Sequence, residues 1–149
     1  MGVDRAELWK GLAETRRFLL AHHLPSERHR CYSPVVFGRR VDVCARCLGI
    51  YPGIVAGFFA YLFAPLPANP TLLVAILPAP ALLDWSMTTF REARGTNTAR
   101  TLTGALLGFG YGLGLSLLVL ESVLAVLVVG LAYGHLAALL LSYSLRLAD

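Results

Sequence analysis

The sequence carries little charge, and this limits the class of protein it can be. Only 15% of its 149 residues are charged, whereas 56% are hydrophobic. A soluble domain carries about 25% charged residues, so an ordinary soluble domain is excluded. After Cys47 the chain consists largely of apolar blocks that approach the length of about 20 residues needed to cross a bilayer. We therefore expect a membrane protein with several spans.

Three further absences narrow the function. The first twenty residues have no uninterrupted apolar core, so no cleavable signal peptide is expected. Leu48, rather than a histidine, follows the Cys44–Cys47 pair, which disfavours covalent haem attachment. No recognised nucleic-acid-binding module accompanies the net charge of +4. Nucleic acid is therefore not an expected partner. Transport is the weakest function hypothesis, because the apolar segments hold few ionisable groups.

Four apolar segments predict four transmembrane helices. Pro78 and Pro80 interrupt the second segment and would kink or split its helix. Gly104, Gly108 and Gly112 in the third segment have the four-residue spacing that lets helix backbones approach closely. The expected fold class is an all-α membrane protein, with one four-helix transmembrane domain over residues 47–149. Its predicted spans are residues 47–66, 71–87, 101–120 and 123–145.

The residues before this bundle are polar and basic. Residues 1–21 are predicted to form an amphipathic helix, because Leu8, Trp9 and Leu12 recur at helical spacing. This helix lies either in the membrane interface or against the protein's own surface. Nine of the thirteen Lys and Arg residues precede Cys47. Since basic residues stay on the cytoplasmic side, both termini are predicted to be cytoplasmic, and membrane lipids are expected partners.

Residues 22–46 are predicted to be a Cys/His-rich cytoplasmic loop without regular structure. Cys44 and Cys47 form a CxxC pair, which can grip one ion or close a disulfide. Thiols in the cytoplasm are normally reduced, which favours a metal. A tetrahedral zinc site takes four ligands. We predict Zn²⁺, or another transition metal, bound by Cys31, Cys44, Cys47 and His23, with His22 and His29 as alternatives to His23. A structural metal knot, a metal centre engaged in chemistry and a redox-active dithiol all stay open.

A second polar group is expected at the same membrane face. Asp84 stands among apolar residues near the end of the second span, where a carboxylate needs a partner or a task. Its candidate partners follow at Arg91, Arg94, Asn97 and Arg100. A pocket here could hold an anionic or polar head group, with Arg100 pairing it and Asp84 acting as base or hydrogen-bond acceptor. The candidate catalytic residues are Asp84, Asn97 and Arg100.

Three stretches together resemble a known family. "VCARCLGIYPG" (43–53), "LLDWSM" (82–87) and "RGTNTARTLTGALLG" (94–108) are similar to an uncharacterised prokaryotic membrane-protein family, the domain of unknown function numbered 2085. The resemblance covers about residues 22–108. "RCYS" (30–33) replaces the family's more common Pro-x-Arg-Ser. The resemblance implies a small helical bundle in a prokaryotic cell membrane and implies no activity. Positions that match the family pattern are Cys44, Arg46, Cys47, Gly49, Tyr51, Asp84, Asn97, Arg100, Thr103 and Gly104.

Three function hypotheses follow. The first is a metal-containing membrane enzyme that acts on a lipid or isoprenoid-like substrate, and it predicts a cavity lined by Asp84, Asn97 and Arg100. The second is a zinc-stapled scaffold or partner-binding protein, which predicts a closed four-ligand site and no cavity. The third is a metal or redox sensor or a small transporter. We favour the first, because two polar groups converge on one membrane face. A second copy of the chain is a further possible partner.

Overall fold

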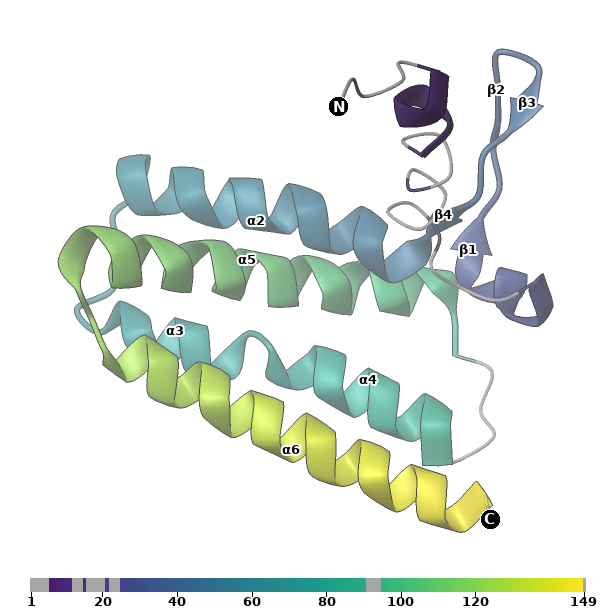
Figure 1. The fold of residues 1–149 in the computed structure, drawn as a ribbon. Coiled ribbons are helices and arrows are strands. Elements are labelled where there is room, and N and C mark those ends of the chain that lie inside the picture. Colours follow the sequence, from purple (N-terminus) through teal and green to yellow (C-terminus); the bar gives the residue numbers. More distant parts are fainter. Residues whose placement is uncertain (1–5, 12–14, 16–20, 22–24, 91–94, 149) are drawn as a thin grey trace.

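The structure is a computed structural model that describes residues 6–11, 15, 21, 25–90 and 95–148. Five helices form the bundle in Figure 1, and a small strand-bearing loop lies at one end of it. The helices are α2 (Ala45–Phe63), α3 (Pro70–Ile76), α4 (Ala79–Phe90), α5 (Asn97–Glu121) and α6 (Ala125–Ala148). The loop holds a 3-10 helix, η1 (Pro25–Arg30), and the strands β1 (Cys31–Tyr32), β2 (Val35–Val36), β3 (Arg39–Arg40) and β4 (Val43–Cys44).

The predicted four-span membrane bundle is confirmed. Within the described residues, four stretches are long and apolar enough to cross a bilayer. The third begins at Asn97, four residues before the predicted start, because Thr96 caps it by accepting a hydrogen bond from the Ala99 amide at 3.2 Å. Polar residues that were assigned to a loop thus form the first turn of a membrane helix. The four spans are residues 45–63, 70–90, 97–121 and 125–146.

Proline divides the second span into α3 and α4, as predicted. Pro78 and Pro80 have no amide hydrogen, so the helical ladder is interrupted between Ile76 and Ala79. In lipid a freed backbone carbonyl needs another donor. The Tyr133 hydroxyl supplies one, donating to the Ala75 carbonyl at 2.6 Å. The break in the second span is therefore tied to α6.

The tightest packing joins α2 to α5, which run parallel and side by side (Figure 1). Glycines face backbone on both helices, and a Cβ placed on any of them would lie 2.0 to 2.5 Å from a carbonyl oxygen of the other helix. Only glycine permits so close an approach. The predicted close packing of the third span is confirmed, and its partner is the first span. The six residues are Gly49, Gly53 and Gly57 of α2 and Gly104, Gly108 and Gly112 of α5.

The bundle has a small internal core and a large apolar exterior. Val74, Leu113 and Leu117 form the buried cluster, between α3 and α5. In the apolar stretch of α6 that is long enough to cross a membrane, no residue is buried. Leucines such as Leu131 and Leu139 are more than half exposed. Apolar side chains left uncovered along a whole helix are what a lipid-facing surface requires.

The loop before α2 is more regular than predicted. β1 pairs with β4 in antiparallel register, Cys31 opposite Cys44, and β2 pairs with β3. In the N-terminal segment, residues 6–11 are helical and both Leu8 and Trp9 are more than half exposed. The described residues leave most of both side chains uncovered. The remainder of the predicted helix over residues 1–21 lies almost wholly outside the described residues.

Candidate functional site

The strand-bearing loop is fixed to the first turn of α5. The Asn97 side-chain amide donates to the Cys31 carbonyl at 3.3 Å. The Thr101 hydroxyl donates to the Ala45 carbonyl at 3.0 Å and lies 3.3 Å from the Tyr32 hydroxyl. Three hydrogen bonds thus hold β1 and the start of α2 against one helix end. Asn97, a predicted catalytic residue, positions the loop.

The three cysteines lie on three adjoining elements, Cys31 on β1, Cys44 on β4 and Cys47 on α2. Cys31 lies opposite Cys44 in the strand pair, and the thiols of Cys44 and Cys47 interact one helical turn apart. All three are free. Burial, followed by the neighbouring Cys44 and Asp42, raises the pKa of the Cys31 thiol above its ordinary value of 9.0. The thiol is therefore protonated at neutral pH, and a metal ion bound there would have to displace the proton.

The fourth ligand of the predicted zinc site is not settled. Among the described residues, no three His, Cys, Asp or Glu side chains are grouped closely enough to hold a metal ion. His29, one alternative ligand, is exposed. His23 and His22 lie outside the described residues. The zinc site stays a prediction.

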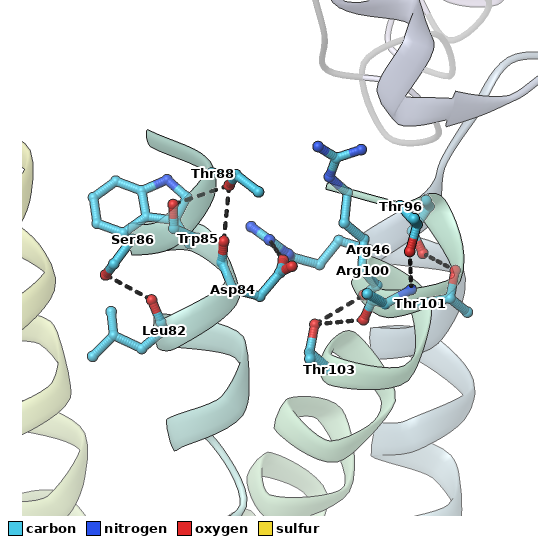
Figure 2. A network of polar contacts seen from close by, with 12 residues as sticks. Arg46, Leu82, Asp84, Trp85, Ser86, Thr88, Thr96, Arg100, Thr101 and Thr103 are labelled. Carbon is cyan, nitrogen blue, oxygen red and sulfur yellow. Dashed lines mark hydrogen bonds and ion pairs between the residues drawn. The ribbon is translucent and has the colours of Figure 1, made fainter. Parts of the chain in front are cut away.

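Asp84 forms an ion pair that the sequence reasoning missed. Its carboxylate accepts a hydrogen bond from Nη2 of Arg46, which reaches across from α2 to α4 (Figure 2). The two side chains are 12% and 24% exposed, so the pair is largely withdrawn from solvent. Of the partners expected from sequence, Arg91 and Arg94 lie outside the described residues. The available signal was Arg46 itself, a charge at the start of an apolar span, which also needs a partner.

Arg100 lies beside this pair and is only 5% exposed. Its Nη1 donates to the Asn97 side-chain oxygen at 3.1 Å. Arg30, Asp84 and Arg46 all lie within electrostatic range of Arg100. Arg30 pairs with Glu27 at 3.2 Å. We refer to Arg30, Arg46, Arg100 and Asp84 as the arginine cluster. With the carboxylate of Glu27 counted beside the cluster, three guanidinium groups stand against two carboxylates, which leaves one net positive charge.

Two nitrogen atoms in the arginine cluster are buried without a hydrogen-bond partner among the described residues. They are Nε of Arg30 and Nε of Arg46. An unsatisfied buried donor costs roughly 1 to 3 kcal/mol, and more where the group is charged. Both nitrogens are therefore donors for which the described residues supply no acceptor.

A groove of about 830 Å³ runs between α4, α5 and α6. This is within the range of roughly 300 to 1,000 Å³ that small-molecule sites occupy. Of the described residues that line it, only Arg46 is charged, and the others are almost all apolar, among them Trp85, Leu107 and Leu118. On α5 the lining extends from Leu107 to Leu118, roughly 16 Å at the helical rise.

The groove differs from the cavity that the sequence predicted. Asp84, Asn97 and Arg100 do not line it, and Arg46 connects it to them through the ion pair with Asp84. The reason is geometric: the α4 face that carries Ala81, Leu82 and Trp85 faces the groove, while Asp84 pairs with Arg46 of α2. The site is an apolar channel with a cationic end.

The comparisons with known proteins identify the family. A model described as "Predicted membrane protein (DUF2085)" matches residues 27–114, more than half of the chain. The uncharacterised protein MJ1492 of Methanocaldococcus jannaschii is 31% identical over 97 residues, which cover 61% of this chain and 58% of that protein. No solved structure matches. The matched region holds the three cysteines, the arginine cluster and the α2–α5 pair, and the chain belongs to the DUF2085 family of predicted membrane proteins.

Proposed function

We propose that this integral membrane protein binds an anionic amphiphile, with its tail in the groove between α4, α5 and α6 and its head group at the arginine cluster. One observation carries the proposal: the described lining of the groove is almost wholly apolar, and its one charged residue is Arg46, in the first turn of α2. Its extent along α5 is roughly half of the ~30 Å hydrocarbon thickness of a bilayer. A lipid or isoprenoid-like chain has this polarity and length.

The arginine cluster suits an anionic head group. Arg30 and Arg46 each hold a buried Nε without a partner among the described residues, and a phosphate or carboxylate oxygen would accept from both. Charge-assisted bonds of this kind are about twice as strong as neutral ones. Asp84 already occupies Nη2 of Arg46, so a head group would compete with Asp84 for that guanidinium.

The same competition for Arg46 suggests how the site could catalyse a reaction. A head group that takes over Arg46 would release the carboxylate of Asp84 beside the bound molecule, where it could accept a proton as a general base. The bound molecule would gain a negative charge when it loses that proton, and Arg100 would stabilise this charge. Asn97 would hold Arg100 in place. In a membrane enzyme acting on a lipid or isoprenoid-like substrate, these three residues would have these roles.

Binding of hexadecyl phosphate to purified protein, measured by native mass spectrometry, tests the proposal. Arg46→Gln should weaken binding at least about tenfold, since a lost charge-assisted bond costs roughly 1.5 to 3 kcal/mol. Asp84→Asn should strengthen binding, because it removes the competing carboxylate. Arg146→Gln is the matched control: it removes the same charge from the exposed end of α6, away from the groove. Equal affinities in all three variants would rule the proposal out.

We also propose that Cys31, Cys44 and Cys47 bind Zn²⁺ together with a histidine, His23 or else His22 or His29. Its support is the pairing of Cys31 with Cys44 across two strands and the contact between the Cys44 and Cys47 thiols. Such an ion would staple the loop to α2. Metal analysis of the purified protein should find one ion per chain, lost in Cys44→Ser and kept in Asp84→Asn. Wild-type protein without a stoichiometric ion would refute the site.

The orientation proposed is with both termini in the cytoplasm of a prokaryotic cell. It rests on the basic residues before α2 and between α4 and α5. Alkaline phosphatase fused after Asp149 should be inactive in cells, while a fusion in the loop at residues 64–69 should be active. The reverse pattern would invert the orientation.

A further inference from the structure

A β-hairpin with an apolar tip projects from the loop before α2. β2 and β3 pair Val35 with Arg40 and Val36 with Arg39, and the Val41 amide donates to the Pro34 carbonyl at 3.0 Å. Phe37 and Gly38 form its turn, with φ angles of 50° and 73°. Two positive φ angles are typical of the tight hairpin turn that normally carries Asn-Gly or Gly-Gly. Phe37 stands where Asn or Gly is preferred.

Phe37 is an unfavourable residue for this position in the protein alone. A bulky side chain with positive φ is a conformational outlier, and strain of this kind costs roughly 1 to 3 kcal/mol. The side chain gains nothing by packing, because it is 101% exposed, and Val35 beside it is 71% exposed. The described chain therefore offers no cover for the most apolar part of the hairpin.

The charge beside this tip is positive. Arg39 and Arg40 follow the turn directly and are both exposed. The nearby carboxylate of Asp42 is held by the Ser33 hydroxyl at 2.5 Å and by Arg28 and Arg40 at 3.7 and 3.5 Å. An aromatic tip flanked by arginines is the composition of an element that lies in a membrane interface with anionic lipids.

The hairpin also lies at the right level. β4 runs without a break into α2, the first span, at Ala45. From there β2 and β3 extend across the direction of the bundle helices, on the side of α2 (Figure 1). An element transverse to the spans at their end runs along the membrane surface.

We propose that the β2–β3 hairpin is a membrane anchor, with Phe37 inserted at the boundary of head groups and acyl chains and with Arg39 and Arg40 at lipid phosphates. The occupant of this surface is the anionic leaflet in which the bundle is embedded. The anchor holds the strand-bearing loop, and with it the mouth of the arginine cluster, at a fixed depth. It depends on the membrane setting alone, so it can fail or hold independently of amphiphile binding in the groove.

Tryptophan fluorescence in lipid nanodiscs tests the anchor. In a parent variant with Trp9→Phe and Trp85→Phe, Phe37→Trp leaves a single tryptophan at the tip. In nanodiscs containing phosphatidylglycerol its emission should shift to the blue, be quenched by lipids brominated near the head group, and resist aqueous iodide. Arg39→Gln added to this variant should lower the ratio of inserted to water-exposed tip about fivefold, since one basic residue near an anionic surface contributes about 1 kcal/mol.

Three further substitutions control for misfolding of the hairpin and for changes in fluorescence that are unrelated to insertion. Val35→Trp in the same parent reports depth without altering the turn. Adding Phe37→Asn, which suits the turn, should move that tryptophan toward water. Arg28→Trp on η1 is the control on an exposed part of the loop outside the hairpin, and it should stay open to iodide. Iodide quenching of the tip variants equal to that of the control, with or without phosphatidylglycerol, would overturn the anchor and point to a soluble partner for the hairpin.

Discussion

The interlocked glycines of α2 and α5 allow a quantitative test of the fold. In Gly53→Ala the new methyl group would lie 2.5 Å from the Ala105 carbonyl oxygen, and in Gly108→Ala 2.2 Å from that of Ile50. Ordinary contact begins at 3.4 Å, so the helices would have to separate by about 1 Å. A gap of that size forfeits a quarter to a half of the dispersion energy along the contact. Overpacking of this kind costs about 1 to 3 kcal/mol.

The helix itself would be stabilised by the same change, because alanine is the better helix former by up to about 1 kcal/mol. The control therefore has to be a glycine of another helix with open space around it. Gly130 of α6 meets this condition, since a Cβ there finds nothing within 4 Å. Gly130→Ala has the gain in helix propensity without the clash. The difference in the free energy of unfolding between it and the other two variants therefore measures the α2–α5 contact alone.

Unfolding in mixed micelles with increasing sodium dodecyl sulfate, followed by circular dichroism, gives the free energies. We expect Gly53→Ala and Gly108→Ala to be less stable than Gly130→Ala by about 1 to 3 kcal/mol, because all three variants share the gain in helix propensity and only the first two have the clash. Equal stability of the three variants would refute the close packing of α2 on α5.

Three smaller predictions concern single polar contacts. Tyr133→Phe removes the hydrogen bond to the Ala75 carbonyl. It should lower the free energy of unfolding in the same assay by about 0.6 kcal/mol, and at most about 1.7. No loss would mean that this hydrogen bond does not fasten α6 to the second span. Asn97→Ala frees the Cys31 carbonyl, so alkylation of Cys31, followed by peptide mass spectrometry, should be faster than in wild type, and an unchanged rate would contradict the pinning of the loop. The hydrogen bond from Ser33, followed by the charges of Arg28 and Arg40, lowers the pKa of Asp42. The ionised carboxylate therefore stabilises the folded protein above the unfolded-state pKa of about 4. This stabilisation is lost as the pH falls through the lower pKa of the folded state. The protection factors of the β1–β4 amides, which correct hydrogen exchange for its intrinsic pH dependence, should fall on acidification in wild type but not in Asp42→Asn. Identical protection profiles in the two proteins would contradict this role.

The spans could be predicted from the sequence because the requirement is local. A bilayer demands about 20 apolar residues in one stretch, and a proline breaks a helix wherever it stands. The four spans and the division at Pro78 follow from these two rules. Glycine spacing on α5 predicted a close approach, but it did not identify Gly49, Gly53 and Gly57 as the partners, since spacing marks a helix face and not its neighbour.

The sequence indicated that Asp84 needs a partner, but it did not identify that partner. Asp84 was expected to find a partner among the residues that follow it, whereas its partner is Arg46, thirty-eight positions earlier. Contacts between helices depend on how the bundle packs, which no local pattern records. The strand pairs of the loop were missed for a related reason: Phe37 occupies a turn position where Asn or Gly gives the usual hairpin signal.

The most direct test of the groove uses Trp85, which lines it. A hexadecyl phosphate brominated along its chain should quench Trp85 fluorescence saturably in nanodiscs of a Trp9→Phe variant, and unlabelled hexadecyl phosphate should reverse the quenching. Gly134→Phe, at a groove-lining glycine with open space around it, should abolish the saturable component, while Leu139→Phe on the exposed surface of the same helix should leave it intact. Equal quenching in the two phenylalanine variants would contradict amphiphile binding in the groove.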